Sequence, residues 1–87
     1  MTKTAVILGV GPAEGLGAYL AVKAAEESLH VIVSGRTQTN LDAVVEIISS
    51  SGAQATGIVA DATDLSSVNT LIKKAEAIGP IDLAIYN

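Results

Sequence analysis

Cysteine, tryptophan and phenylalanine are absent from this chain of 87 residues, and two tyrosines are its only aromatic residues. Without cysteine there is no disulfide framework, no thiol nucleophile and no cysteine-ligated metal, so we expect no metal site. The composition fits a reducing compartment, and we expect a cytoplasmic protein. The chain also lacks an excess of basic residues. Its net charge of −4 argues against non-specific binding of nucleic acid, which requires a basic surface.

Long hydrophobic runs are missing too. No apolar stretch reaches the roughly 18 residues that a membrane-spanning helix needs, and we expect no membrane segment. Hydrophobic residues nevertheless make up 49% of the chain. They are mainly alanine, valine, isoleucine and leucine, which typically fill a parallel sheet covered by helices.

Short β-branched runs alternate with longer helical stretches along the chain. We expect strands over residues 5–8, 30–34, 55–59 and 81–86, and helices over residues 15–29, 39–51 and 64–78. This alternation indicates βαβ units with right-handed crossovers and therefore a parallel sheet. The predicted fold class is α/β: a partial, Rossmann-like, doubly wound sheet of four strands and three helices with strand order 3-2-1-4.

The helix predicted over residues 64–78 has both an amphipathic pattern and end signals. Asp64 can cap its start, and Gly79 and Pro80 can end it. Its predicted buried face consists of Leu65, Val68, Leu71, Ile72 and Ala75, which recur at helical spacing. The first helix, over residues 15–29, is rich in alanine, so its buried face requires close packing of backbones.

The last predicted strand is apolar on both faces, as in a central strand, yet the chain stops at Asn87. Only one helix is available for the second face of the sheet. We therefore expect residues 1–87 to form one α/β domain that is incomplete at its C-terminal side. Either further chain covers this side, or copies of the chain associate through the exposed sheet face or edge.

Four glycines lie between the first predicted strand and the first helix, at Gly9, Gly11, Gly15 and Gly17. We expect Gly11 to allow a sharp turn out of the strand, Gly15 to let a pyrophosphate approach, and Gly17 to let helix and strand pack closely. Free N–H groups and the helix dipole then favour an anion. The alternative is that the glycines serve strand-to-helix packing alone.

The end of the second predicted strand bears on which dinucleotide is preferred. Folds that prefer NAD place an acidic residue there to bind the ribose 2′-hydroxyl, but here the stretch is Ser34-Gly35-Arg36-Thr37. Arg36 can bind a 2′-phosphate through charge-assisted hydrogen bonds. We therefore predict NADP as the cofactor in preference to NAD. The alternative is that Arg36 is an ordinary solvated surface residue.

Four stretches together resemble the N-terminal part of the short-chain dehydrogenase/reductase family. They are "GPAEGLG" at residues 11–17, "SGRT" at 34–37, "ADATD" at 60–64 and "IDLAIYN" at 81–87. The resemblance implies that Asp61 hydrogen-bonds the adenine amino group, that Ala62 lines the adenine pocket and that Asn87 lies beside the adenosine ribose. Two residues depart from the family motifs: Val10 replaces a threonine, and Tyr86 replaces the first asparagine of N-N-A-G.

The family's catalytic serine, tyrosine and lysine lie beyond the matched region. Tyr19 and Lys23 have the family's Y-x-x-x-K spacing and share a helix face, but they fall in the first helix, without a serine to complete a relay. We interpret Tyr19 as a packing residue and Lys23 as a solvated one. His30, the only histidine, is interpreted as a strand-edge residue.

We therefore expect residues 1–87 to be one NAD(P)-binding Rossmann-type domain, incomplete at its C-terminal side. It would be the nucleotide-binding portion of an NADP(H)-dependent short-chain oxidoreductase, with no catalytic residue and with a small-molecule substrate only in a longer parent protein. The predicted cofactor-binding residues are Gly11, Ala13, Glu14, Gly15, Leu16, Gly17, Ser34, Arg36, Thr37, Asp61, Ala62 and Asn87. Two alternatives remain: a self-associating, non-enzymatic nucleotide-binding or interaction module, and a fragment of an S-adenosylmethionine-dependent methyltransferase. The second predicts an acid after strand two, which the sequence lacks.

Overall fold

A computed structural model describes residues 2–11 and 15–86 of the chain. Strands and helices alternate throughout these residues, and the strands form one parallel sheet of order β3-β2-β1-β4. The predicted fold class, the number of elements and the strand order are confirmed. The elements are β1 (Thr4–Leu8), α1 (Leu16–Glu26), β2 (His30–Gly35), α2 (Gln38–Ser50), β3 (Ala55–Val59), α3 (Leu65–Ile78) and β4 (Ile81–Tyr86).

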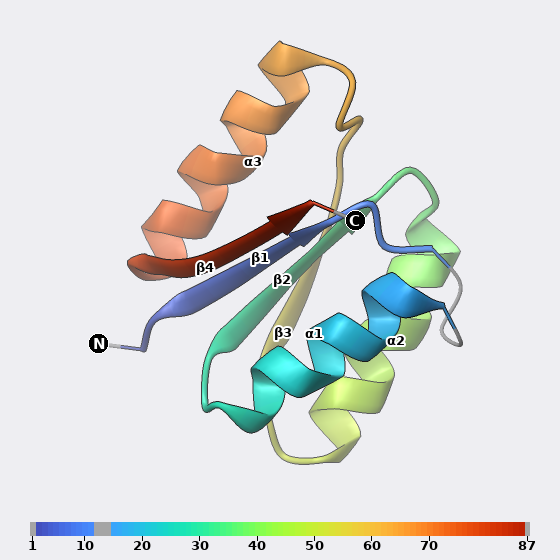
Figure 1. The fold of residues 1–87 in the computed structure, drawn as a ribbon, viewed down its shortest axis with the longest axis vertical. Coiled ribbons are helices and arrows are strands. Elements are labelled where there is room, and N and C mark those ends of the chain that lie inside the picture. The colour runs from blue at the N-terminus through green and yellow to red at the C-terminus, as the bar shows by residue number, and fades with distance from the viewer. Residues whose placement is uncertain (1, 12–14, 87) are drawn as a thin grey trace.

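Helices α1 and α2 cover one face of the sheet, and α3 lies on the other (Figure 1). Successive side chains of a strand point to opposite faces, so β1 contributes to both layers. Ala5 and Ile7 pack in the larger apolar cluster with residues of α1 and α2. Val6 packs in the smaller cluster with Leu71 and Ala75 of α3. The sheet is therefore doubly wound, with the thinner layer on the α3 side.

Helix α1 packs closely through its alanines, as the composition predicts. Ala18, Ala21, Ala24 and Ala25 are all buried against the sheet and α2. The helix ends at Glu26, three residues before the predicted end. Ser28 adopts the left-handed conformation, with a φ of 64°. An α-helix cannot continue through a residue with positive φ, so the chain turns here into β2.

The predicted start and end of α3 are confirmed, but one residue of its predicted buried face is not. The carboxylate of Asp64 accepts a hydrogen bond of 3.0 Å from the Ser66 N–H, and Gly79 follows the last helical residue. Leu71 and Ala75 are fully buried, whereas Leu65 is 75% exposed. The prediction that Leu65 is buried is wrong: the residues of α3 that pack in the apolar cluster, Leu71 and Ala75, come later in the helix.

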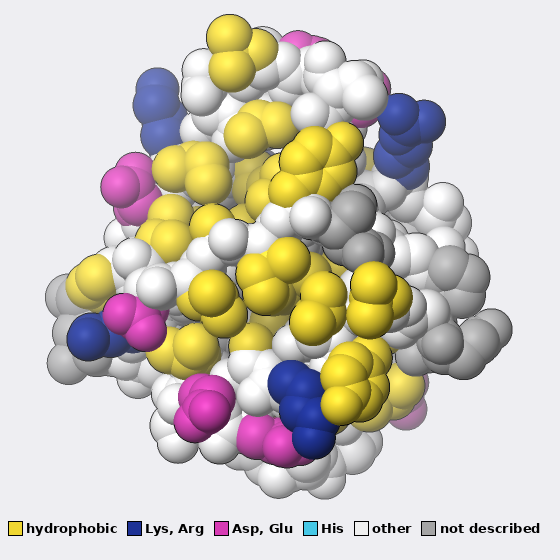
Figure 2. All heavy atoms as spheres, in the orientation of Figure 1, with side chains coloured by type: hydrophobic (Ala, Val, Ile, Leu, Met, Phe, Trp, Pro, Cys, Tyr) yellow, Lys and Arg dark blue, Asp and Glu magenta, His cyan; other side chains and the backbone are white. Residues whose placement is uncertain are grey.

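Strand β4 forms an edge of the sheet and pairs with β1 alone among the described strands. Its side chains are half-buried or exposed, and Leu83 is 38% exposed. Figure 2 shows hydrophobic side chains gathered over the middle of the face to which β4 belongs. The uncovered side expected from the sequence is therefore present, and self-association through it remains a prediction. Within the described residues, no helix is long and apolar enough to cross a membrane.

The cap of α3 predicts the effect of a single substitution. Asp64→Ala removes the acceptor for the Ser66 N–H and should lower the free energy of unfolding by about 0.5–2 kcal/mol. Asp64→Asn retains a capping oxygen and should be close to wild type. Urea denaturation monitored by circular dichroism measures both, and an equal loss in the two variants would contradict a capping role.

Candidate functional site

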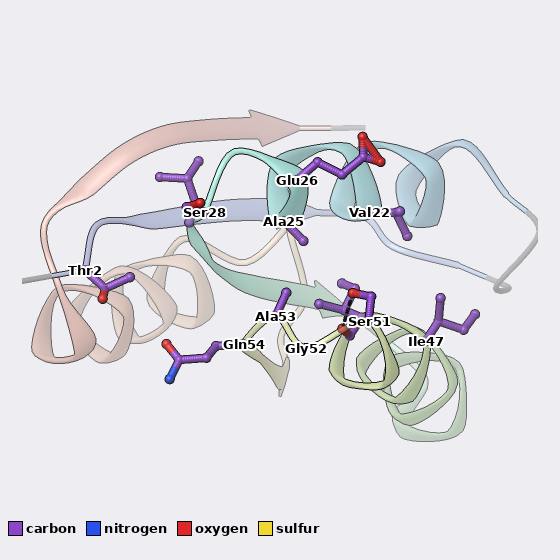
Figure 3. A pocket seen from close by; sticks show the side chains of 12 residues that line it. Thr2, Val22, Ala25, Glu26, Ser28, Ile47, Ser51, Gly52, Ala53 and Gln54 are labelled. Carbon is purple, nitrogen blue, oxygen red and sulfur yellow. Dashed lines mark hydrogen bonds between the residues drawn. The ribbon is translucent and has the colours of Figure 1, made fainter.

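The structure has hollows at both ends of the sheet. The larger, of about 530 Å³, lies between α1 and α2 where the strands begin and includes Thr2, Ser28 and Gln54 (Figure 3). The smaller, of about 290 Å³, lies where the strands end. Ligands of open α/β sheets bind outside the carboxyl ends of the strands. We therefore take the smaller hollow as the candidate site, even though the other is larger.

The floor of the candidate site is the turn that leaves β1. Gly9 has a φ of 79°, a conformation that favours glycine, and it follows the last residue of the strand. The prediction that Gly11 makes this turn is wrong: its φ is not positive, and a Cβ there would meet no atom within 4 Å. Gly9, Val10 and Gly11 all line the hollow.

The turn is joined to the end of β2 by the peptide groups of Val10. The Val10 N–H donates to the Ser34 carbonyl oxygen at 2.8 Å. A Cβ added to Gly35 would overlap the Val10 carbonyl oxygen. Gly35 is thus required for the close approach of two backbones, a role that the sequence does not reveal because the two segments are 25 positions apart. Ser34 is buried beneath this contact.

Arg36 extends from the end of β2 to the rim of the site, where it meets Asp61. Its guanidinium Nη2 lies 3.5 Å from the Asp61 Oδ1, and both side chains are well exposed, at 69% and 48%. An ion pair of this kind contributes about 0–1 kcal/mol. Arg36 and Asp61 come from the ends of neighbouring strands, so the fold brings together two residues that the sequence singled out separately.

Thr63 fixes the carboxylate of Asp61. The Thr63 N–H and hydroxyl both donate to Asp61 Oδ1, at 2.9 and 2.6 Å, and the Asp61 N–H donates to the Ser67 hydroxyl oxygen at 2.9 Å. These hydrogen bonds from Thr63, followed by the charge of Arg36, lower the pKa of Asp61 below its ordinary value. Asp61 is therefore ionised at neutral pH and carries a full negative charge at the rim.

The remaining predicted residues are distributed around the start of α1 and α2. Gly15 is the N-cap of α1, and Leu16 and Gly17 begin the helix; no described side chain caps its first N–H groups. Thr37 precedes α2 and lines the hollow, as does Ala62. Ala13, Glu14 and Asn87 were also predicted to bind cofactor, and they lie outside the described residues.

Seven residues that line the hollow were not among the predicted cofactor-binding residues: Gly9, Val10, Gly35, Asn40, Ala60, Thr63 and Tyr86. Asn40 lies in the first turn of α2, shortly after the end of β2. Thr63 lies in the loop between β3 and α3. Both residues therefore come to the rim at the carboxyl ends of the strands. Tyr86 was noted only as a departure from a family motif. Its place at the carboxyl end of β4 was a signal that could have assigned it.

Tyr19 and Lys23 lie on α1 outside the candidate site. The Lys23 Nζ is 5.5 Å from the centroid of the Tyr19 ring and 3.6 Å from a carboxylate oxygen of Glu26. The interpretation of Tyr19 as a packing residue is wrong: its side chain is 58% exposed, because the neighbouring alanines face the sheet. His30 begins β2, and its Nε2 lies 2.8 Å from the Thr56 hydroxyl.

Comparison with known proteins yields one family. Residues 3–87 match the short chain dehydrogenase family. An uncharacterised oxidoreductase from Mycobacterium tuberculosis is 36% identical over 86 residues, which cover 98% of this chain and 32% of that protein. The family match favours an oxidoreductase over the methyltransferase alternative.

Solved structures agree with this match. A short-chain dehydrogenase from Rhodopseudomonas palustris superposes with a TM-score of 0.90 at 27% identity, over 98% of this chain and 39% of that one. A 3-oxoacyl (acyl-carrier-protein) reductase from Agrobacterium tumefaciens, crystallised with NADP bound, has a TM-score of 0.80 at 33% identity, over 94% and 31%. The chain therefore spans about a third of the length of these relatives.

The contact between Val10 and Gly35 predicts a difference between two glycine substitutions. Gly35→Ala should lower the free energy of unfolding by more than about 1 kcal/mol, because either Val10 or the end of β2 must move. Gly11→Ala places its methyl group in open space and should stay within about 0.5 kcal/mol of wild type. Chemical denaturation of both variants checks this, and equal stabilities would contradict the contact.

Proposed function

The chain belongs to the short-chain dehydrogenase family, and we propose that it is the nucleotide-binding portion of an NADP(H)-dependent oxidoreductase. On this proposal the hollow at the carboxyl ends of β1, β2 and β3 receives the adenosine phosphate and the pyrophosphate. The observation that carries the proposal is the position of Arg36, which lines this hollow together with the turn after β1. The relative from Agrobacterium tumefaciens, crystallised with NADP, supports it.

The residues around the hollow fit a pyrophosphate. Residues 9–11 line the hollow, and glycine at positions 9 and 11 has no side chain there. The N-cap of α1 is Gly15, and the backbone N–H groups and the dipole at the start of a helix favour an anion. Gly11, Gly15, Leu16 and Gly17 would hold the pyrophosphate through these groups.

The residues at the end of β2 fit a 2′-phosphate better than a ribose hydroxyl. Arg36 has five N–H donors, and its contact with Asp61 uses one nitrogen at a long distance of 3.5 Å. The other donors remain free to bind phosphate oxygens. A charge-assisted hydrogen bond contributes about 1.5–3 kcal/mol, more than an exposed ion pair. A 2′-phosphate would therefore compete successfully with Asp61 for Arg36, with Thr37 beside it. The side chain of Ser34 is buried and is not among the residues that line the hollow.

The bound dinucleotide would supply hydride transfer. Residues of this chain would bind and orient its adenosine end: Arg36 at the 2′-phosphate, and, as the resemblance implies, Asp61 and Ala62 at the base and Asn87 beside the ribose. Ala13 and Glu14 stay predicted cofactor-binding residues of the glycine loop. The proton donor and the substrate pocket would come from protein outside these 87 residues. Tyr19 and Lys23 do not serve, because they lie on α1 away from the candidate site.

The proposal predicts that Arg36→Ala weakens binding of NADPH about ten- to hundredfold, the equivalent of one charge-assisted contact. Binding of NADH should be nearly unchanged, because NADH carries no 2′-phosphate. Isothermal titration of the chain with each cofactor gives both dissociation constants. Lys23→Ala is the matched control, since it removes one positive charge outside the hollow and should alter neither constant by more than a small factor. Equal losses for NADPH and NADH in Arg36→Ala would refute the assignment of Arg36.

The chain should also bind NADPH without oxidising it. Mixed with NADPH and a panel of small carbonyl compounds, it should show no loss of reduced cofactor above the rate without protein. If oxidation were seen, it would contradict the proposal that the catalytic residues lie elsewhere. Tyr19→Phe would then show whether the Tyr19–Lys23 pair was responsible.

A further inference from the structure

Tyr86 has no role in the core of the protein. It is the last residue of β4, its side chain is 70% exposed, and it belongs to neither apolar cluster. The chain has only two aromatic residues, and this one borders the candidate site. A large ring exposed at the rim of the hollow gains little from burial among the described residues, so its face is accessible to a group bound in the hollow.

The pairing of the strands fixes the side of the sheet on which the ring lies. Tyr86 is in register with Leu8 of β1, and residues in register on neighbouring strands share a face. Leu8 packs against the cluster on the α3 side, whereas Ile85 packs against the cluster on the opposite side. The ring of Tyr86 therefore lies on the α3 side of the sheet.

The segment that leads into α3 lies on this same side. Ala60, Ala62 and Thr63 line the hollow together with Tyr86. The hollow is thus lined by an aromatic ring and by a loop segment in which alanines alternate with Asp61 and Thr63. At about 290 Å³ it is small, so a flat group held there would contact both. Arg36 and Thr37 lie at the same hollow.

We propose that Tyr86 is a cofactor-binding residue whose ring stacks on the adenine base of the dinucleotide. This inference rests on the proposed function, since the base beside a 2′-phosphate held by Arg36 is adenine rather than nicotinamide. Stacking of a base on an aromatic side chain is sensitive to truncation of that side chain to alanine. Tyrosine supplies here a flat surface that the asparagine of the family motif does not.

Truncation of the ring tests the proposal with a probe that carries only the adenosine end, adenosine 2′,5′-bisphosphate. Tyr86→Ala should raise its dissociation constant about tenfold, and Tyr86→Asn should do the same. Tyr86→Phe keeps the ring and should bind like wild type. Reduced nicotinamide mononucleotide, which lacks adenosine, should bind Tyr86→Ala and wild type alike. Leu83→Ala is the matched control, because Leu83 is partly exposed on the same strand and is not among the residues of the hollow.

Tyrosine fluorescence gives a direct readout, because the chain has no tryptophan and only two tyrosines. In a Tyr19→Phe background, Tyr86 is the only tyrosine of a chain without tryptophan. Titration with adenosine 2′,5′-bisphosphate should quench its emission, with the same dissociation constant as calorimetry gives. Unchanged emission at saturation would overturn the proposal, as would a Tyr86→Phe variant that binds as weakly as Tyr86→Ala.

The outcomes separate this inference from the proposed function. If Arg36→Ala selectively weakens NADPH while Tyr86→Ala binds like wild type, stacking is refuted and the proposed function stands. If the wild-type chain binds neither NADPH nor adenosine 2′,5′-bisphosphate, both are refuted. A loss confined to reduced nicotinamide mononucleotide would also overturn the inference, because it would place the ring at the other end of the cofactor.

Discussion

The peptide unit of Val10 connects the turn after β1 to the end of β2, and the candidate site depends on this contact. Its N–H donates to the Ser34 carbonyl, and its carbonyl lies where a Cβ of Gly35 would be. The hydrogen bond fixes the position of the turn relative to the end of β2. The contact with Gly35 fixes how closely the backbones of the turn and of β2 approach each other. Arg36 follows directly, so its backbone is held at a set distance from the floor of the hollow.

The walls of the hollow are of two chemical kinds. Arg36 and Asp61 form an exposed pair of opposite charges, in which Thr63 holds the carboxylate still while the guanidinium keeps most of its donors. The ring of Tyr86 and the side chains of Ala60 and Ala62 supply apolar surface to the same hollow. A ligand complementary to both walls must be anionic at one point and flat and apolar at another. Nucleotides have this combination, whereas simple phosphates or hydrophobic substrates have half of it.

The sequence predicted the features that depend on residues near one another along the chain. It missed contacts between segments that are distant in sequence and close in the fold. Element order and the cap at Asp64 follow from local periodicity and hydrogen bonding, and both are confirmed. Leu65 recurs at the spacing of the buried face of α3. Its burial also requires part of the sheet to lie opposite it, which the spacing does not show. The turn after β1 was assigned to Gly11 and not to Gly9, because the spacing of glycines in a motif does not show which of them has a positive φ. Gly35 was not recognised as a contact residue, because its partner Val10 is near only in space.

Thr4 connects the start of β1 to the residues that lead into β4. Its N–H donates to the Pro80 carbonyl at 2.7 Å, and its hydroxyl donates to the Gly79 carbonyl at 3.3 Å, 75 positions away. By contrast, its register partner on β2 is His30. Closing the longer loop costs about 1 kcal/mol more in chain entropy, and such high contact order slows folding. During synthesis, β1 can therefore pair with β2 long before residue 81 has been made, and until then its other edge is open to strands of other chains.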